Sequence, residues 1–511
     1  LTSGLSSLLA TVINAPRAGA AAAAASSSPN ITSSDNFLFS SAYQSVTWNG
    51  ELVGQTINIT DGTLSGKLWS AQALLDTQVA PTQATPGPTT RKVYTNVSGA
   101  LTDFLWGNLT AAQKVYFKAP YLTYTSATSG LSQFCSSGST CLTPTEQSSI
   151  TAATNGAAGE NLVNYLRGDR GNEAAFYRTR SHALGAIVPP QSLYVKTPIL
   201  NLSDAWYAEY NAAKAGRASR VYVGANDGML HAFDATTGAE AWAYIPSAVL
   251  PDLYKLADIN YATQHQFCVD GSPEVGDIYA AGSWKTTLVG GLNRGGKGYY
   301  ALDITDPANP TLLWEFADAN MGYSYGNPRI VKLGGSSSDA GKWVVLVTSG
   351  YSNADGKGHL YVLNANTGAV IRDISTGVGS AASPSGLARI SARVVSPDTD
   401  STVEAVYGGD LLGNLWRFDV NGDVGASGYE AQLLVTLKDG SGNAQPITAK
   451  PTVATVDGVP VVFIGTGVFL GTSDVTSTRQ QSFYAVKDLL NATTYSNPRS
   501  VGSNFVQQTM V

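Results

Sequence analysis

Apolar residues in the second half of the chain form short runs that alternate with polar positions and are separated by turn residues. The clearest case begins at Arg220, where the apolar run 221–223 and the mainly apolar run 229–233 flank Asp227-Gly228. Asp-Gly favours a tight hairpin because both positions tolerate positive φ. The pattern therefore predicts two paired strands that end at Asp234.

This strand pattern recurs further along the chain. Its later copies end at Asp303, Asn364, Asp419 and Asp488, with separations of 69, 61, 55 and 69 residues. Each of these copies also has an apolar strand upstream, as expected for one decorated blade of a propeller. We therefore predict an all-β fold, a β-propeller of about seven blades, in which earlier strands supply the remaining blades and the ring closure.

The first half of the chain is less regular. Residues 1–35 are rich in Ala and Ser and are expected to be a flexible lead. Residues 36–75 alternate in part and predict a strand pair that includes Ser45–Trp48, with a turn at Asp61-Gly62. We therefore predict one propeller domain over 36–511.

Within this domain, residues 80–180 are expected to be rich in insertions and 220–490 to hold the clear blade repeats. The Pro- and Thr-rich stretch at 80–91 predicts a loop, whereas 101–116 and 143–167 have helical periodicity. In the latter, Thr143 is placed to cap a helix, with Pro144 in its first turn and Glu146 completing a capping box. The fold prediction is therefore a propeller with helical and loop insertions.

The composition argues against two classes of function, nucleic-acid binding and insertion into a membrane. Only 13% of the residues are charged, and the net charge is −6 without any run of Lys or Arg. Such a chain presents no electrostatic footprint for a nucleic acid or an anionic membrane, and no stretch has the roughly 18 apolar residues of a membrane span. We expect neither nucleic-acid binding nor membrane insertion. The first residue is Leu, which is compatible with removal of a signal peptide or an upstream domain.

The spacing of two of the three cysteines favours a protein that is exported from the cytoplasm. Cys135 and Cys141 bracket a polar loop, as a small disulfide would, while Cys268 has no obvious mate. The sequence leaves the oxidation state of all three cysteines open.

Motifs for catalysis are weak. Gly322–Gly326 matches a nucleophile elbow around Ser324, but the following Asn327-Pro328 disfavours the helix that this motif needs. The four histidines have no metal-ligand spacing, and His231 and His359 are expected to pack on blades. We predict that the protein is not an enzyme.

Several longer strings are more specific than the blade pattern. They are Val221 to Pro246, Asp270 to Pro273, Gly298 to Asp303, Gly408 to Asp419 and Gln445 to Thr448. In this order and at these separations they resemble the carboxy-terminal domain of the PilC/PilY family, and the blade pattern itself is similar to that of quinoprotein propellers. The resemblance covers most of 160–490, beginning near Asn164 to Asp169.

The resemblance implies a modified seven-bladed propeller that promotes pilus assembly or opposes retraction. It implies a tip-located adhesin of the type IV pilus, with roles in twitching motility and surface attachment. Minor pilins are the implied partners, together with a host or surface ligand. The implied location is extracytoplasmic, at the pilus tip, cell surface, outer membrane or periplasm.

The family also implies a calcium site in an acidic loop before a Tyr-(Ala/Gly)-Gly-Asp-Leu string. The matching residues here are Asp398, Asp400, Thr402 and Glu404, with Thr402 supplying its carbonyl oxygen. Alternate residues of a tight loop can turn oxygens toward one hard cation. Two residues depart from the family pattern: Ser396 replaces a first acidic ligand and Ser401 the turn-forming Gly.

Two other functions remain open. A quinone-dependent periplasmic dehydrogenase has similar blades, but this chain has no Cys-Cys pair of the kind that such alcohol dehydrogenases often carry. A generic adhesin or lectin-like propeller overlaps with the tip role. The sequence does not identify a surface ligand, the contacted pilins or the blades that they contact.

Overall fold

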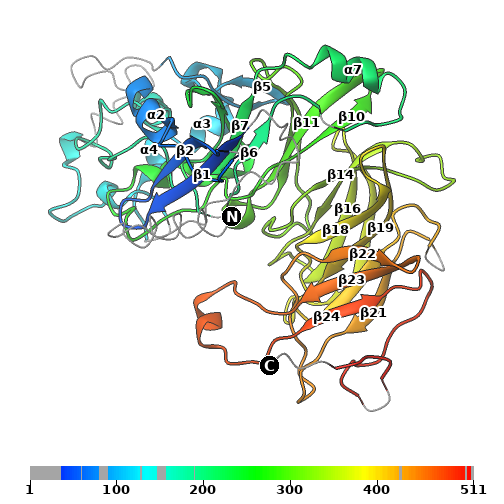
Figure 1. Ribbon diagram of the computed structural model, residues 1–511. Helices are drawn as coiled ribbons and strands as arrows, with labels where there is room; N and C mark the ends of the chain where they lie inside the picture. The colour runs from blue at the N-terminus through cyan, green and yellow to red at the C-terminus, as the bar shows by residue number, and fades with distance from the viewer. Residues whose placement is uncertain are drawn as a thin grey trace.

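In a computed structural model, mainly antiparallel sheets follow one another along the chain in an arc (Figure 1). The structure describes residues 36–507 except 59, 80–89, 127–128, 147–156, 189, 199, 425–427 and 501–502. The predicted lead at 1–35 and nearly all of the predicted loop at 80–91 lie outside the described residues.

Five groups of strands carry the sequence repeat, and we call them blades 1 to 5. Blade 1 contains β6 (Leu193–Val195), β7 (Arg220–Ala225), β8 (Met229–Asp234) and β9 (Glu240–Ile245). Blade 2 contains β10 (Glu274–Ala280), β11 (Ser283–Gly291), β12 (Tyr299–Asp303) and β13 (Thr311–Phe316). Blade 3 contains β14 (Arg329–Lys332), β15 (Trp343–Thr348), β16 (Lys357–Asn364) and β17 (Val370–Gly379). Blade 4 contains β18 (Ile390–Ser396), β19 (Asp400–Gly409), β20 (Asn414–Phe418) and β21 (Ala431–Thr436), and blade 5 contains β22 (Thr452–Val456), β23 (Val459–Gly465) and β24 (Phe483–Lys487).

The predicted strand pairs are confirmed in all five blades. Each is an antiparallel pair of adjacent strands: β7 with β8, β11 with β12, β15 with β16, β19 with β20, and β23 with β24. In the first pair, Gly228 has φ +94°, a conformation that a residue with a Cβ rarely adopts. The Asp-Gly signal therefore located the turn correctly.

The Asp or Asn that ends each repeat has a common structural role. Its side-chain oxygen accepts a hydrogen bond from the backbone N–H two residues later, which fixes the turn into the next segment. The five bonds join Asp234 to Thr236, Asp303 to Thr305, Asn364 to Asn366, Asp419 to Asn421 and Asp488 to Leu490, at 2.9–3.1 Å. The repeat that identified the blades is therefore a repeated turn cap.

A sheet of β1 (Phe37–Gln44), β2 (Asn49–Thr56) and β3 (Trp69–Ser70) precedes blade 1. Its Trp69 donates a 3.1 Å hydrogen bond to the Ala235 carbonyl and lies against Gly238 of blade 1. A similar hydrogen bond links blade 1 to blade 2, where the Trp242 indole N–H donates to the Pro307 carbonyl. Another links blade 2 to blade 3, where the Trp314 indole N–H donates to the Ala365 carbonyl. The first sheet thus packs on blade 1 as blade 1 packs on blade 2 and blade 2 on blade 3.

One detail of this first sheet was predicted wrongly. Ser45–Trp48 forms the turn between β1 and β2 rather than part of a strand, because Gln44 pairs directly with Asn49. The Trp48 backbone N–H bonds the Gln44 carbonyl, which closes the turn. Local alternation of apolar residues misled the assignment.

The insertion-rich region contributes one further hairpin and half of the described helical elements. The hairpin of β4 (Val93–Val97) and β5 (Ala100–Asp103) extends blade 1, with β4 parallel to β9. The helical prediction for 101–116 is therefore wrong at its start, and helix forms only from Trp106 onward. The helical elements are α2 (Ala71–Val79), η1 (Trp106–Asn108), α3 (Ala111–Val115), α4 (Ala119–Leu122), η2 (Ser132–Phe134), α6 (Ala157–Leu166), α7 (Tyr207–Ala213), η3 (Ser247–Ala257), η4 (Asn293–Gly295) and η5 (Thr472–Thr476).

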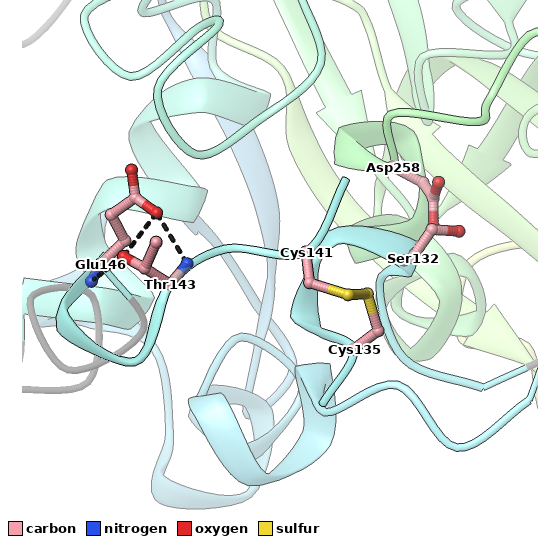
Figure 2. The surroundings of a disulfide bond; sticks show 6 residues. All are labelled: Ser132, Cys135, Cys141, Thr143, Glu146 and Asp258. Carbon is pink, nitrogen blue, oxygen red and sulfur yellow. Dashed lines mark hydrogen bonds between the residues drawn. A yellow bond between two sulfur atoms is a disulfide. The ribbon is translucent and has the colours of Figure 1, made fainter. Parts of the chain in front are cut away.

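Two local predictions in this region are confirmed (Figure 2). Cys135 and Cys141 form a disulfide with Cα atoms 5.2 Å apart, while Cys268 is a buried free thiol. The Thr143 hydroxyl accepts from the Glu146 N–H at 3.2 Å, and the Glu146 carboxylate accepts from the Thr143 N–H at 2.7 Å. These bonds are the predicted capping box.

Blades 3 and 4 are joined into one continuous sheet. The joint is a parallel pairing of β14 with β19 at Lys332 and Thr402. Among the described residues, no strand pairing connects β22–β24 to β1–β3, which lie at the two ends of the arc (Figure 1). The count of about seven blades and the ring closure stay predictions.

Candidate functional site

The predicted calcium residues lie on the β18–β19 hairpin of blade 4. Ser396 and Asp400 pair across its end, so Pro397, Asp398 and Thr399 form the turn. Pro suits a tight turn because its φ is already fixed. Asp398 is exposed at the tip.

The other three residues belong to strand β19. Because side chains alternate along a strand, Asp400, Thr402 and Glu404 share one partly exposed face, while Ser401 and Val403 are buried on the other. A register shift in the pairing with β18 falls close to Glu404. The segment is thus strand from Asp400 onward rather than an open loop.

Both carboxylates on this face already have cationic partners. Lys332 Nζ lies 3.0 Å from Asp400 Oδ1, and Arg393 forms an ion pair with Glu404. The Thr402 hydroxyl donates to the same Asp400 oxygen at 2.6 Å. Thr402 and then Lys332 hold the pKa of Asp400 below its usual value, so this side chain is ionised at neutral pH.

The predicted ligands do not converge on one point in this geometry. Asp400 and Glu404 are four residues apart along a strand, about 13 Å between Cα atoms, whereas calcium needs six to eight oxygens within about 2.6 Å of the ion. Among the described residues, no three His, Cys, Asp or Glu side chains are gathered closely enough to hold a metal ion. The observed arrangement does not fit calcium, and calcium binding stays a prediction.

Sequence reasoning missed the segment that lies against this hairpin. The N–H groups of Asn201 and Ser203 donate to the carbonyls of Asp398 and Thr399, both at 2.8 Å. Asp204 follows directly and pairs with Lys332 at 2.8 Å. No local signal links these residues, since the contact spans 196 positions along the chain.

A second charged cluster lies inside blade 1. His231 is fully buried between Glu240, 2.7 Å from its Nδ1, and Asp227, 3.1 Å from its Nε2. Arg91 makes a two-point contact with Glu240 and is also buried. Burial alone would lower the pKa of His231, but Asp227 and Glu240 raise it to about 9. His231 was predicted to pack on a blade, and it does so as a cation.

The raised pKa predicts a pH dependence. Folded His231 keeps a proton that the unfolded chain releases near pH 6.5, so its stabilising contribution is complete below about 6.5 and is lost as the pH rises through about 9. We expect the free energy of unfolding to fall over this range by up to ~1.4 kcal/mol per pH unit from this group. Denaturant unfolding at a series of pH values measures the slope. His231→Gln should flatten it, and an unchanged slope in this variant would contradict the assignment.

The side chains of the two remaining candidate residues, Ser324 and His359, form hydrogen bonds or ion pairs within the fold. Ser324 is fully buried and its hydroxyl donates to the Gly298 carbonyl at 2.8 Å, and strand β14 rather than a helix follows it. His359 lies between Asp355 and Asp373, at 3.0 and 2.8 Å. The geometry of a nucleophile elbow is therefore not present at Ser324.

The fold and the site define the class of protein: a β-propeller whose blades repeat the same turn cap, with tryptophan contacts between the first sheets and with the charged clusters of blades 1 and 4 engaged in structural ion pairs. The PilY1 β-propeller domain family matches residues 189–511. The chain therefore belongs to the PilY1 family, as the sequence strings indicated.

Similar proteins extend this finding to the first half of the chain. A type IV pilus biogenesis factor PilY1 of Pseudomonas aeruginosa strain PAK is 35% identical over 91% of this chain and 40% of its own length. A PilY1 homologue of Xylella fastidiosa is 39% identical over 65% of this chain and 27% of its own length. The crystal structure of the Pseudomonas aeruginosa PilY1 C-terminal domain matches with a TM-score of 0.50 and 35% identity, covering 59% of this chain and 66% of that one.

The chain spans about two fifths of the length of the Pseudomonas relative that it matches. Both of these relatives are named for type IV pilus biogenesis, one as a PilY1 factor and the other as a PilY1 homologue. Among the described helices, none is both long and apolar enough to cross a bilayer.

Proposed function

We propose that this protein acts in the biogenesis of type IV pili, in a role that is not enzymatic. The observation that carries the proposal is the 35% identity, over 91% of this chain, to a protein named a type IV pilus biogenesis factor. The family match to the propeller over 189–511 supports it. A propeller offers a rigid scaffold whose loops can contact other proteins.

The finer role is a tip-located adhesin that promotes pilus assembly or opposes retraction. Twitching motility and attachment to surfaces would then depend on it. Its partners would be minor pilins and a host or surface ligand, and its location extracytoplasmic, at the pilus tip, cell surface, outer membrane or periplasm. Support comes from the named function of the relatives and from the family resemblance of the sequence strings.

Deletion of the gene in its source organism tests the proposal. We expect fewer surface pili by electron microscopy and reduced twitching, with both restored by the gene on a plasmid and not by the empty plasmid. Normal piliation and motility in the deletion strain would overturn the proposal.

A second strain separates assembly from retraction. The same deletion is made in a background that cannot retract its pili. Pili that return in this background indicate that the protein opposes retraction, whereas pili that remain absent indicate a requirement in assembly. Attachment is then scored on strains with equal numbers of pili, so that adhesion is measured independently.

A further inference from the structure

Lys332 occupies a junction between three parts of the chain. Its backbone pairs with Thr402 where blade 3 meets blade 4. Its ammonium contacts both oxygens of Asp204, at 2.8 and 2.9 Å, and one oxygen of Asp400, at 3.0 Å. Only 14% of the Lys332 side chain is exposed, so this cation is largely removed from solvent.

The segment that carries Asp204 is itself held in place. Trp284 of blade 2 donates to the Ala205 carbonyl at 2.9 Å, and Tyr207 donates to Asp277 at 2.7 Å. The exposed Trp206 stacks on Tyr279 with ring centroids 5.7 Å apart. The segment is therefore a fixed support, anchored on blade 2, against which the hairpin tip of blade 4 rests.

The hairpin meets this support through its backbone as well as through Lys332. The carbonyls of Asp398 and Thr399 accept from the N–H groups of Asn201 and Ser203. Carbonyls that accept these bonds are directed toward the support and not toward a shared cation. The tip is thus docked by two backbone bonds, by a bond of 3.0 Å from the Ser203 hydroxyl to the Thr399 carbonyl, and by one ammonium between two carboxylates.

An ammonium is a compact point charge with three donors, and between two carboxylates it neutralises both. We propose that Lys332 supplies the positive charge that fixes the 396–404 hairpin to segment 201–204, so that the hairpin is held without a bound metal ion. This inference rests on the Lys332 contacts and not on the proposed function. It replaces the calcium expected from the family resemblance with a side chain of this protein.

Hydrogen exchange at the Asn201 and Ser203 amides tests the inference, because these N–H groups are protected only while the hairpin is docked. In the purified protein with Lys332→Met, we expect these amides to exchange at least about tenfold faster than in the wild type. Wild-type exchange is expected to be the same with a chelator and with millimolar calcium. Lys342→Met is the matched control, since Lys342 forms a partly exposed ion pair with Asp339 just before β15, away from the hairpin, and its replacement should leave both amides unchanged.

Two results would overturn the inference. One is wild-type exchange that is fast in the chelator and slowed by calcium, which would assign the docking to the metal. The other is unchanged protection in Lys332→Met. If that variant does not fold, Asp204→Asn removes the second charge from the same contact, and the same acceleration is expected there with the unfolding midpoint near that of the wild type.

Discussion

Replacing Glu240 with alanine is expected to lower the free energy of unfolding by about 3–5 kcal/mol. Glu240 is the carboxylate that faces both Arg91 and His231 inside blade 1. Its removal leaves these two neighbouring buried cations with Asp227, which forms its ion pair with His231. A buried charge without a partner costs several kcal/mol because water no longer solvates it.

Denaturant unfolding of the wild type and the variant measures this loss. Glu274→Ala is the control, because Glu274 forms an ion pair of 2.7 Å with Arg329 that is partly exposed. Such a pair contributes at most about 1 kcal/mol. If Glu240→Ala and Glu274→Ala lower the free energy of unfolding equally, the buried position of Glu240 adds nothing to the effect and the prediction is wrong.

Replacing Asp488 with alanine is expected to have a comparable effect at the other end of the arc. Asp488 pairs with Arg417 at 2.6 Å, and each side chain is only 1% exposed. Asp488 also accepts from the Tyr407 hydroxyl at 2.8 Å, so it ties the end of β24 to two strands of blade 4. We expect a loss of about 3–5 kcal/mol, since Arg417 would be left as a buried, unpaired cation.

Asp488→Asn serves as the comparison for this second prediction. Its side-chain oxygen can still accept from the Leu490 N–H and preserve the turn, while the negative charge is lost. Chemical denaturation should therefore give Asp488→Asn a free energy of unfolding between those of the wild type and Asp488→Ala. If both variants unfold like the wild type, the ion pair does not hold blade 5 to blade 4.

The repeats were predictable because their signals are local. Asp227-Gly228 sets a hairpin through the conformations that these two residues tolerate, and the Asp that ends the repeat caps a turn two residues later. The same holds for the capping box at Thr143 and Glu146. Each of these features depends on residues within a few positions of each other.

The candidate cation site was only half predictable for the opposite reason. The sequence places Asp398, Asp400, Thr402 and Glu404 on one hairpin, and the structure agrees that they belong to it. It gives no sign that Lys332 and Asp204 meet Asp400, since strand pairing and an insertion on another blade bring them together. Arg91 escaped notice likewise, because its partner Glu240 lies 149 positions away.

The docking of the hairpin on segment 201–204 also has a consequence for the order of folding. Each blade pairs strands that are neighbours in the sequence, and such sheets can form early because little chain has to be closed into a loop. The bond from Ser203 to Thr399 closes a loop of 196 positions and requires blades 2, 3 and 4 to be in place first. The tip of blade 4 is therefore expected to dock late in folding. Protection of the Asn201 and Ser203 amides from hydrogen exchange would then show that the intervening blades have already assembled.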